Sequence, residues 1–307
     1  MPYIIFLFLR ISEDKINFGF LLIISGISFS VLDNFRISLE GSEGVLYLVD
    51  YYSKLRPLVF DALSRTGDYY RVGGYTASYH DSANILGILG SYYFVKSLVD
   101  KCLYQILIAL VAFSAMAVTQ SATNIVMYML TCFIFSIYFF IQMPTIITVG
   151  LFFVIGIILT LIIIKLPEVL IFSERIGESG DWQGMGNSLT LDIIFSPSFW
   201  FGFGYTTGSE YVDTEIGYLK AILERGFVPA CLLFWILIYP IYVFIKLKQK
   251  SLNSLPCLAA IVFGFLSLSH YGSLFRVTNV AIFYLIYSLF FIKIISDNDK
   301  ALKKYET

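Results

Sequence analysis

Long apolar segments constrain the fold of this chain more than any other feature of its sequence. Each is roughly 17–20 residues long, which is the length that an α-helix needs to cross the hydrocarbon core of a bilayer. The chain is 58% hydrophobic and 14% charged, a balance that soluble domains of this size do not have. About eight segments qualify: Ile16–Leu32, Ala83–Val99, Cys102–Thr119, Asn124–Ile141, Ile146–Ile164, Phe227–Ile245, Leu255–Ser269 and Thr278–Ile295. The sequence therefore predicts an all-α polytopic membrane protein, with residues 1–307 as a single integral membrane domain.

Basic side chains predict which way these helices run. Short loops rich in lysine and arginine stay in the cytoplasm. With the C-terminal lysines placed there, eight spans put both termini in the cytoplasm, and the other short basic loops agree: Arg10 and Lys15, Lys96 and Lys101, and Lys246, Lys248 and Lys250. Both long polar segments then lie on the opposite face. Residues 33–82 are expected to carry interfacial helices, and residues 165–226 form a large outer loop between the fifth and sixth spans.

The outer face holds most of the arginines, while the basic residues of the inner face are nearly all lysines. Lysine is well suited to orienting helices in the membrane, whereas the planar guanidinium of arginine is well suited to binding carboxylate or phosphate groups. The outer arginines are Arg36, Arg56, Arg65, Arg71, Arg175, Arg225 and Arg276. A net charge of −1 argues against nucleic acid as a partner. The chain has no Gly-Lys-Ser/Thr nucleotide motif, and its two histidines do not form a His-Glu-x-x-His metal motif.

A first polar motif precedes and enters the second span. It runs from Arg71 through Tyr75 and His80-Asp81 to Asn84. At helical spacing, the sequence places His80, Asn84, Gly87 and Ser91 on one face, which must contact protein or water rather than lipid. One interpretation is a helix-packing seam of small residues with a polar cap. The other is the floor of an outer cavity, with Arg71 as an anion ligand and His80 or Asp81 as a proton acceptor.

Two further outer motifs have both structural and functional interpretations. Arg175 follows the fifth span and is either an interfacial anchor or a ligand. The sequence predicts a helix that begins near Asp213 and Glu215 and ends at Gly226. Its two acidic side chains either cap the helix in contact with solvent or face the outer cavity. His270 follows the seventh span at its outer end, either as hydrogen-bonded structure or as part of the same site.

In their order, spacing and side of the membrane, these motifs resemble the O-antigen polymerase and O-antigen ligase superfamily of bacterial inner-membrane proteins. The resemblance covers roughly Arg71 to Ile295. It rests on the Arg71 to Gly87 motif, on the outer loop from Arg175 to Gly226, and on the late His270-Tyr271 pair.

The resemblance implies a GT-C-like helical fold with a periplasmic outer face and neither a metal nor a nucleotide cofactor. It implies transfer of an oligosaccharide from undecaprenyl diphosphate to a sugar hydroxyl. Arginines would then neutralise the diphosphate, and a general base would activate the acceptor hydroxyl. The diphosphate ligands are expected to be Arg71, Arg175 and Arg276. Asp213 is the first candidate for the base, with Glu215, His80 and Asp81 as alternatives, and the sugar pocket is assigned to Tyr75, Asn84, Trp182, Trp200, Tyr205 and His270.

Within that superfamily, two departures favour a repeat-unit polymerase over a ligase. Ligases often carry Ser-Arg where this chain has Ser121-Ala122, and they tend to have a histidine where Asp213-Thr214 stand. The expected product is O-antigen, capsule or exopolysaccharide. A membrane protein that regulates the length of the glycan chain is a further expected partner. The alternatives are a ligase that transfers finished glycan to lipid A core, and a flippase for lipid-linked sugars. A flippase would place broken, charged helices near the midplane.

Overall fold

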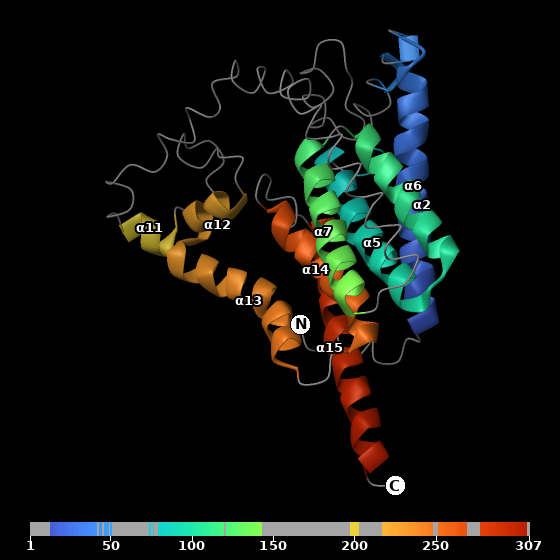
Figure 1. Ribbon diagram of the computed structural model, residues 1–307. Coiled ribbons are helices and arrows are strands. Elements are labelled where there is room, and N and C mark those ends of the chain that lie inside the picture. Colours follow the sequence, from blue (N-terminus) through green and yellow to red (C-terminus); the bar gives the residue numbers. More distant parts are fainter. Residues whose placement is uncertain are drawn as a thin grey trace.

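The computed structural model describes residues 13–41, 43–44, 46–48, 50, 74, 76, 79–119, 121–142, 197–202, 217–247, 251–268 and 277–305. Every regular element in these ranges is helical. The longer helices form a bundle (Figure 1) and are α2 (Glu13–Ser38), α5 (Tyr79–Asp100), α6 (Leu103–Val118), α7 (Ala122–Gln142), α13 (Phe227–Lys246), α14 (Leu255–Ser267) and α15 (Val277–Tyr305). The shorter elements are α11 (Pro197–Phe201), α12 (Gly217–Arg225) and the 3₁₀ turn η2 (Leu252–Ser254).

Seven of the predicted spans overlap helices of the described ranges, and the predicted span Ala83–Val99 lies within α5, which does not meet the criterion of length and apolarity for crossing a membrane. In the described ranges, four helices are long and apolar enough to cross a membrane: α2, α7, α13 and α15. α6 and α14 are shorter apolar helices that match two further predicted spans. The predicted fifth span, Ile146–Ile164, lies outside the described residues. The described part of the chain is therefore that of a helical membrane protein, with the lipid bilayer as its environment.

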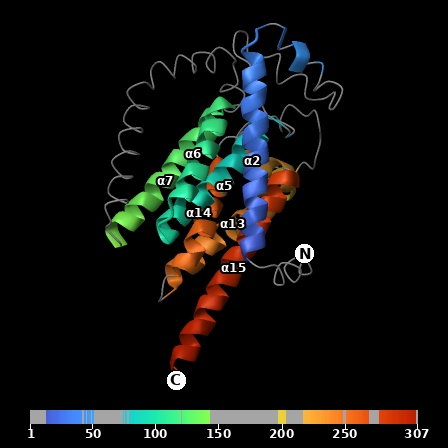
Figure 2. The ribbon, with the colours of Figure 1, turned by 90° about the vertical axis from the view of Figure 1, so that its right-hand side faces the viewer.

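Helix α5 is the centre of the bundle. It packs against α2, α6, α7, α14 and α15 (Figure 2), and it is buried without interruption from His80 to Val95. Protein rather than lipid surrounds α5, which explains how the helix tolerates polar side chains along its length. The prediction that His80, Asn84, Gly87 and Ser91 avoid lipid is confirmed, although the same is true of the other faces of this helix.

Two glycines allow neighbouring helices to approach α5 closely. A Cβ atom added to Gly87 would lie 2.0 Å from Cζ of Phe263 on α14, and one added to Gly90 would lie 2.9 Å from Cε2 of Tyr128 on α7. Each glycine therefore accommodates an aromatic ring against the backbone of α5. At these two positions the structure has the small-residue packing that is typical of membrane helices.

Two helices extend beyond their predicted ends. α2 continues past Leu32 to Ser38, and in this region Arg36 pairs with Asp33 and with Glu40 just beyond the helix, with a nitrogen-to-oxygen distance of 3.1 Å to each. The outer segment predicted for residues 33–82 therefore begins with the last turns of α2. α15 continues to Tyr305 and projects past the other helices (Figure 1).

Ion pairs join three helices at the end of the bundle predicted to be cytoplasmic. Oε1 of Glu13 on α2 lies 2.6 Å from Nζ of Lys293 on α15 and 3.9 Å from Nζ of Lys96 on α5. Nζ of Lys96 also lies 2.9 Å from Oδ2 of Asp100 within α5. Burial alone would raise the pKa of Asp100. Hydrogen bonds from Gln105 and Lys96, together with the nearby lysine charges, outweigh burial and lower that pKa. The charged groups at this end therefore pair with one another and connect the helices.

Candidate functional site

A buried group of polar side chains lies at the opposite end of the bundle, where α5, α7 and α15 begin and α14 ends. We call it the polar cluster. Its members are His80, Asp81, Asn84, Ser121, Asn124, Ser267 and Asn279, and each has at most 8% of its surface exposed. Polar groups buried within a membrane bundle are costly unless they bond to one another, and they are often functional. The cluster is therefore the strongest candidate site in the described residues.

One part of the cluster connects α5 to the turn before α7. Nδ1 of His80 lies 3.2 Å from Oγ of Ser121, and Nδ2 of Asn124 donates to the same oxygen at 2.9 Å. Thr119 fixes the turn, because its hydroxyl donates to the carbonyl of Met116 and accepts from the backbone N–H of Ser121. The α6–α7 turn thus holds Ser121 in position against His80.

The other part connects α5 to α14 and α15. Nδ2 of Asn84 donates to Oγ of Ser267 at 3.0 Å, and Nδ2 of Asn279 lies 3.4 Å from Oδ1 of Asp81. Ser267 in turn donates to the carbonyl of Gly264 within its own helix. Side chains from the first turns of α5 therefore reach two helices that are almost 200 residues away in the chain.

The cluster combines groups that can bind and deprotonate a hydroxylated ligand. Asp81 can accept a proton, and the imidazole of His80 can either accept or donate one. Both residues lie in the first turn of α5, where the backbone N–H groups favour a negative charge. In the described part of the chain, no group of three or more His, Cys, Asp and Glu residues is arranged to hold a metal ion.

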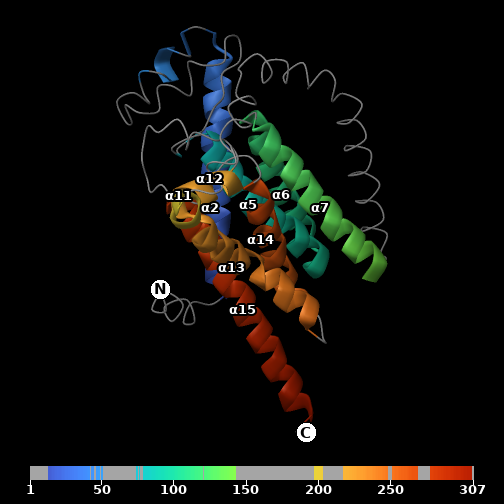
Figure 3. The same ribbon diagram turned by 90° about the vertical axis from the view of Figure 1, so that its left-hand side faces the viewer.

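A second feature near the same end is the junction of α11, α12 and α13 (Figure 3). Gly202 and Gly226 both have positive φ angles, +87° and +90°, and their backbones cross. A Cβ atom on Gly226 would lie 2.4 Å from the carbonyl oxygen of Trp200. Only glycine at both positions allows this crossing, which joins α11 to the start of α13.

Trp200 and Tyr218 lie on the two short helices of this junction. The Trp200 ring packs edge-on against Phe227 and remains 45% exposed, so part of its face is available for stacking. Tyr218 donates its hydroxyl to the carbonyl of Phe265 and attaches α12 to α14. Burial raises the pKa of Tyr218 to about 12, so this donor stays protonated at neutral pH.

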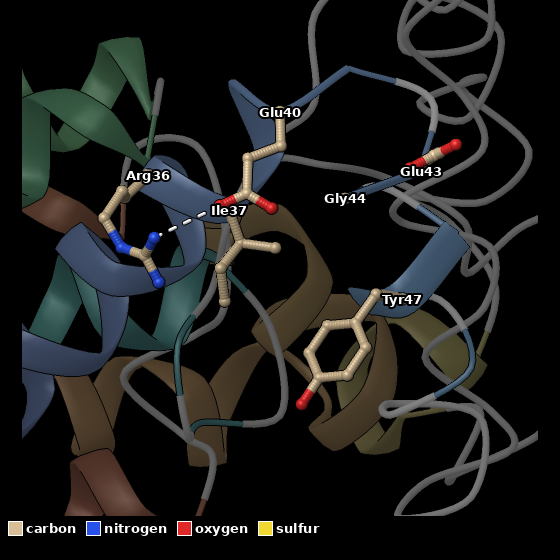
Figure 4. Close-up of a pocket in the computed structure, with 6 residues that line it drawn as sticks. All are labelled: Arg36, Ile37, Glu40, Glu43, Gly44 and Tyr47. Carbon is tan, nitrogen blue, oxygen red and sulfur yellow. Dashed lines mark hydrogen bonds and ion pairs between the residues drawn. The ribbon is translucent and has the colours of Figure 1, made fainter.

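A cavity of about 360 Å³ lies near the end of α2 (Figure 4). It is lined by Arg36, Ile37, Glu40, Glu43, Gly44 and Tyr47. Arg36 already pairs with Asp33 and Glu40, so its charge is satisfied within α2. The cavity shares no residue with the polar cluster or with the predicted site, and it is a weaker candidate than the cluster.

The structure brings together three of the predicted site residues. His80, Asp81 and Asn84 are members of the polar cluster, whereas Trp200 lies on α11 at the glycine junction. The predicted residues that lie outside the described ranges are Arg71, Tyr75, Arg175, Trp182, Tyr205, Asp213, Glu215, His270 and Arg276.

Sequence reasoning missed four members of the cluster. They are Ser121, Asn124, Ser267 and Asn279. Each lies at or near the outer end of a predicted span, so a search for polar residues at all outer helix ends would have found them. Nothing in the sequence indicates which of those ends meet.

Comparison with known proteins adds no family assignment. No family model, no curated protein and no solved structure matches the chain. The resemblance to the O-antigen polymerase and ligase superfamily therefore stays a prediction from the motifs, and the geometry of the cluster is the independent basis for a functional proposal.

Proposed function

We propose that the chain is a polysaccharide repeat-unit polymerase, which transfers an oligosaccharide from undecaprenyl diphosphate to a sugar hydroxyl at the periplasmic face of the bacterial inner membrane. The observation that carries the proposal is the polar cluster. It groups a buried carboxylate, an imidazole and several amide and hydroxyl groups at one end of the bundle. Such a set can orient a sugar hydroxyl and take up its proton.

The proposed topology has eight spans in a GT-C-like arrangement, with both termini in the cytoplasm. It is supported by the different chemistry of the two helix ends. Lys96 and Lys293 form ion pairs at one end of α5 and α15, and His80 and Asn279 lie at the other end of the same helices. Alkaline phosphatase fusions test this topology. Fusions within residues 165–226 should be active, and fusions after residue 305 should be inactive.

The proposed chemistry needs positive charge for the diphosphate and a base for the acceptor. Arg71, Arg175 and Arg276 remain the proposed diphosphate ligands. Asp213 remains the first candidate for the base, with Glu215, His80 and Asp81 as alternatives. α12 begins four residues after Asp213 in the chain and is attached through Tyr218 to α14. Because α14 also supplies Ser267 to the cluster, we treat the acids that precede α12 as part of the same site.

The test is complementation of a deletion strain, followed by electrophoresis of the surface glycan. A polymerase deletion leaves a single repeat unit on the core, a ligase deletion leaves none, and a flippase deletion retains the lipid-linked unit on the cytoplasmic side. Asp81→Asn should abolish the long glycan, whereas Asp100→Asn, the matched change at the other end of α5, should preserve it. Immunoblots of the membrane fraction control for expression. A normal glycan ladder in the deletion strain would exclude the proposal.

A further inference from the structure

The hydrogen bonds around Ser121 determine which nitrogen of His80 can carry a proton. In the described structure, Oγ of Ser121 has two polar side-chain neighbours, His80 Nδ1 at 3.2 Å and Asn124 Nδ2 at 2.9 Å. An amide nitrogen can only donate, so Ser121 accepts from Asn124. The single hydroxyl hydrogen of Ser121 is then available for His80, and Nδ1 of a neutral imidazole accepts it.

We propose that Asn124 and Ser121 are positioning residues that hold His80 as the neutral tautomer with its proton on Nε2. His80 then acts on the substrate as a hydrogen-bond donor and not as the base. The functional role rests on the proposed function, whereas the tautomer is inferred from the hydrogen bonds among these three side chains.

The surroundings of His80 favour this tautomer. His80 is 8% exposed, and its Nδ1 lies 3.2 Å from the hydroxyl oxygen of Ser121. With the proton on Nδ1 instead, the Ser121 hydroxyl hydrogen would need another acceptor, and the described contacts of Ser121 supply none.

This assignment separates the roles within the cluster. An Nε2–H group can donate to an oxygen of the substrate and stabilise negative charge there as the reaction proceeds. It cannot accept the proton of the attacking hydroxyl, so that task falls to a carboxylate. His80 thereby leaves the set of candidate bases, and Asp81, Asp213 and Glu215 remain.

The tautomer can be measured without any assay of activity. The chain has two histidines, so a His270→Gln variant labelled with ¹⁵N-histidine gives the imidazole signals of His80 alone. At neutral pH, we expect a protonated Nε2 and an unprotonated Nδ1. Ser121→Ala and Asn124→Leu should convert this spectrum into a mixture of tautomers. Ser136→Ala, which removes a buried hydroxyl from α7 that bonds to Cys132, should leave it unchanged. A protonated Nδ1 in the His270→Gln protein would overturn the inference.

The role of His80 can be tested with two amide substitutions in the complementation assay. Glutamine can place an N–H donor near the position of Nε2, whereas asparagine reaches only the position of Nδ1. His80→Gln should therefore retain long glycan, and His80→Asn should lose on the order of 10- to 100-fold, the effect of removing one donor to a charged group. Equal loss in both variants would assign His80 as a base. An unaffected deletion strain would instead refute the proposed function and leave the tautomer measurement standing.

Discussion

The contact between Gly87 and Phe263 offers a demanding test of the bundle, because a single methyl group should disturb it. Cβ of an alanine at position 87 would lie 2.0 Å from Cζ and 2.5 Å from both Cε atoms of the Phe263 ring. Ordinary contact begins at 3.4 Å, so the ring or the helix must move by about 1.4 Å. The ring is fully buried, and Tyr128 packs edge-on against it, which limits that movement.

Two opposing effects set the magnitude. Gly→Ala within a helix favours folding by about 1 kcal/mol. Overpacking of a well-packed core costs about 1–3 kcal/mol, and the upper part of that range applies where a buried ring cannot move away. We expect a net loss of about 1–2 kcal/mol for Gly87→Ala. Gly26→Ala on α2 is the matched control, because an added Cβ there meets no atom within 4 Å.

The assay is thermal unfolding of the purified protein in detergent, followed by fluorescence-detected size-exclusion chromatography. Stability changes shift Tm by roughly 2–4 °C per kcal/mol in chains of 150–250 residues, so Gly87→Ala should lower Tm by several degrees. Gly26→Ala should not lower it. Adding Phe263→Leu to Gly87→Ala should recover part of the loss by making room for the methyl group. A Gly87→Ala protein as stable as the wild type would refute this account of α5–α14 packing.

Three further predictions concern the periphery of the bundle. Gly226→Ala places a side chain at φ +90°, ψ 157°, at a cost on the order of 1–3 kcal/mol, and should speed amide exchange in α11 without affecting α2. Tyr218→Phe removes the hydrogen bond to α14, worth about 1 kcal/mol, and should speed exchange in α12; unchanged exchange would contradict that attachment. The lowered pKa of Asp100 contributes stability above its ordinary unfolded pKa of about 4, and this contribution is lost as pH falls through the folded value. Asp100→Asn should therefore flatten the acid limb of a Tm-against-pH curve, and an unchanged curve would contradict the assignment.

The sequence predicts the helices well because bilayer thickness imposes a length and a polarity on each of them. The span predicted as Phe227–Ile245 is the helix Phe227–Lys246, and the one predicted as Asn124–Ile141 is Ala122–Gln142. α2 contains the predicted span Ile16–Leu32 and continues beyond it to Ser38, through polar residues that include Asp33 and Arg36. A search for long apolar segments does not detect polar helical turns that extend beyond the membrane.

The site is predicted less completely because its contacts are tertiary. Asn84 and Ser267 are separated by 183 residues, and nothing in the local sequence of either one indicates the other. The same holds for Asp81 and Asn279, which belong to helices at opposite ends of the chain. Helical periodicity identifies the buried polar residues of α5. Their partners depend on how α7, α14 and α15 are arranged around that helix.

Helix α5 carries one aspartate near each end, Asp81 buried and Asp100 exposed, and the two have different partners. Asp100 has the ammonium group of Lys96 at 2.9 Å, and such a charge opposes proton uptake by a carboxylate. Asp81 is fully buried, and its described hydrogen bond comes from the neutral amide of Asn279. Asp81 lies in the polar cluster beside His80 and Asn84, whereas Asp100 belongs to an ion-paired group at the other end of α5. Of the two, Asp81 is therefore the one that we propose as a base.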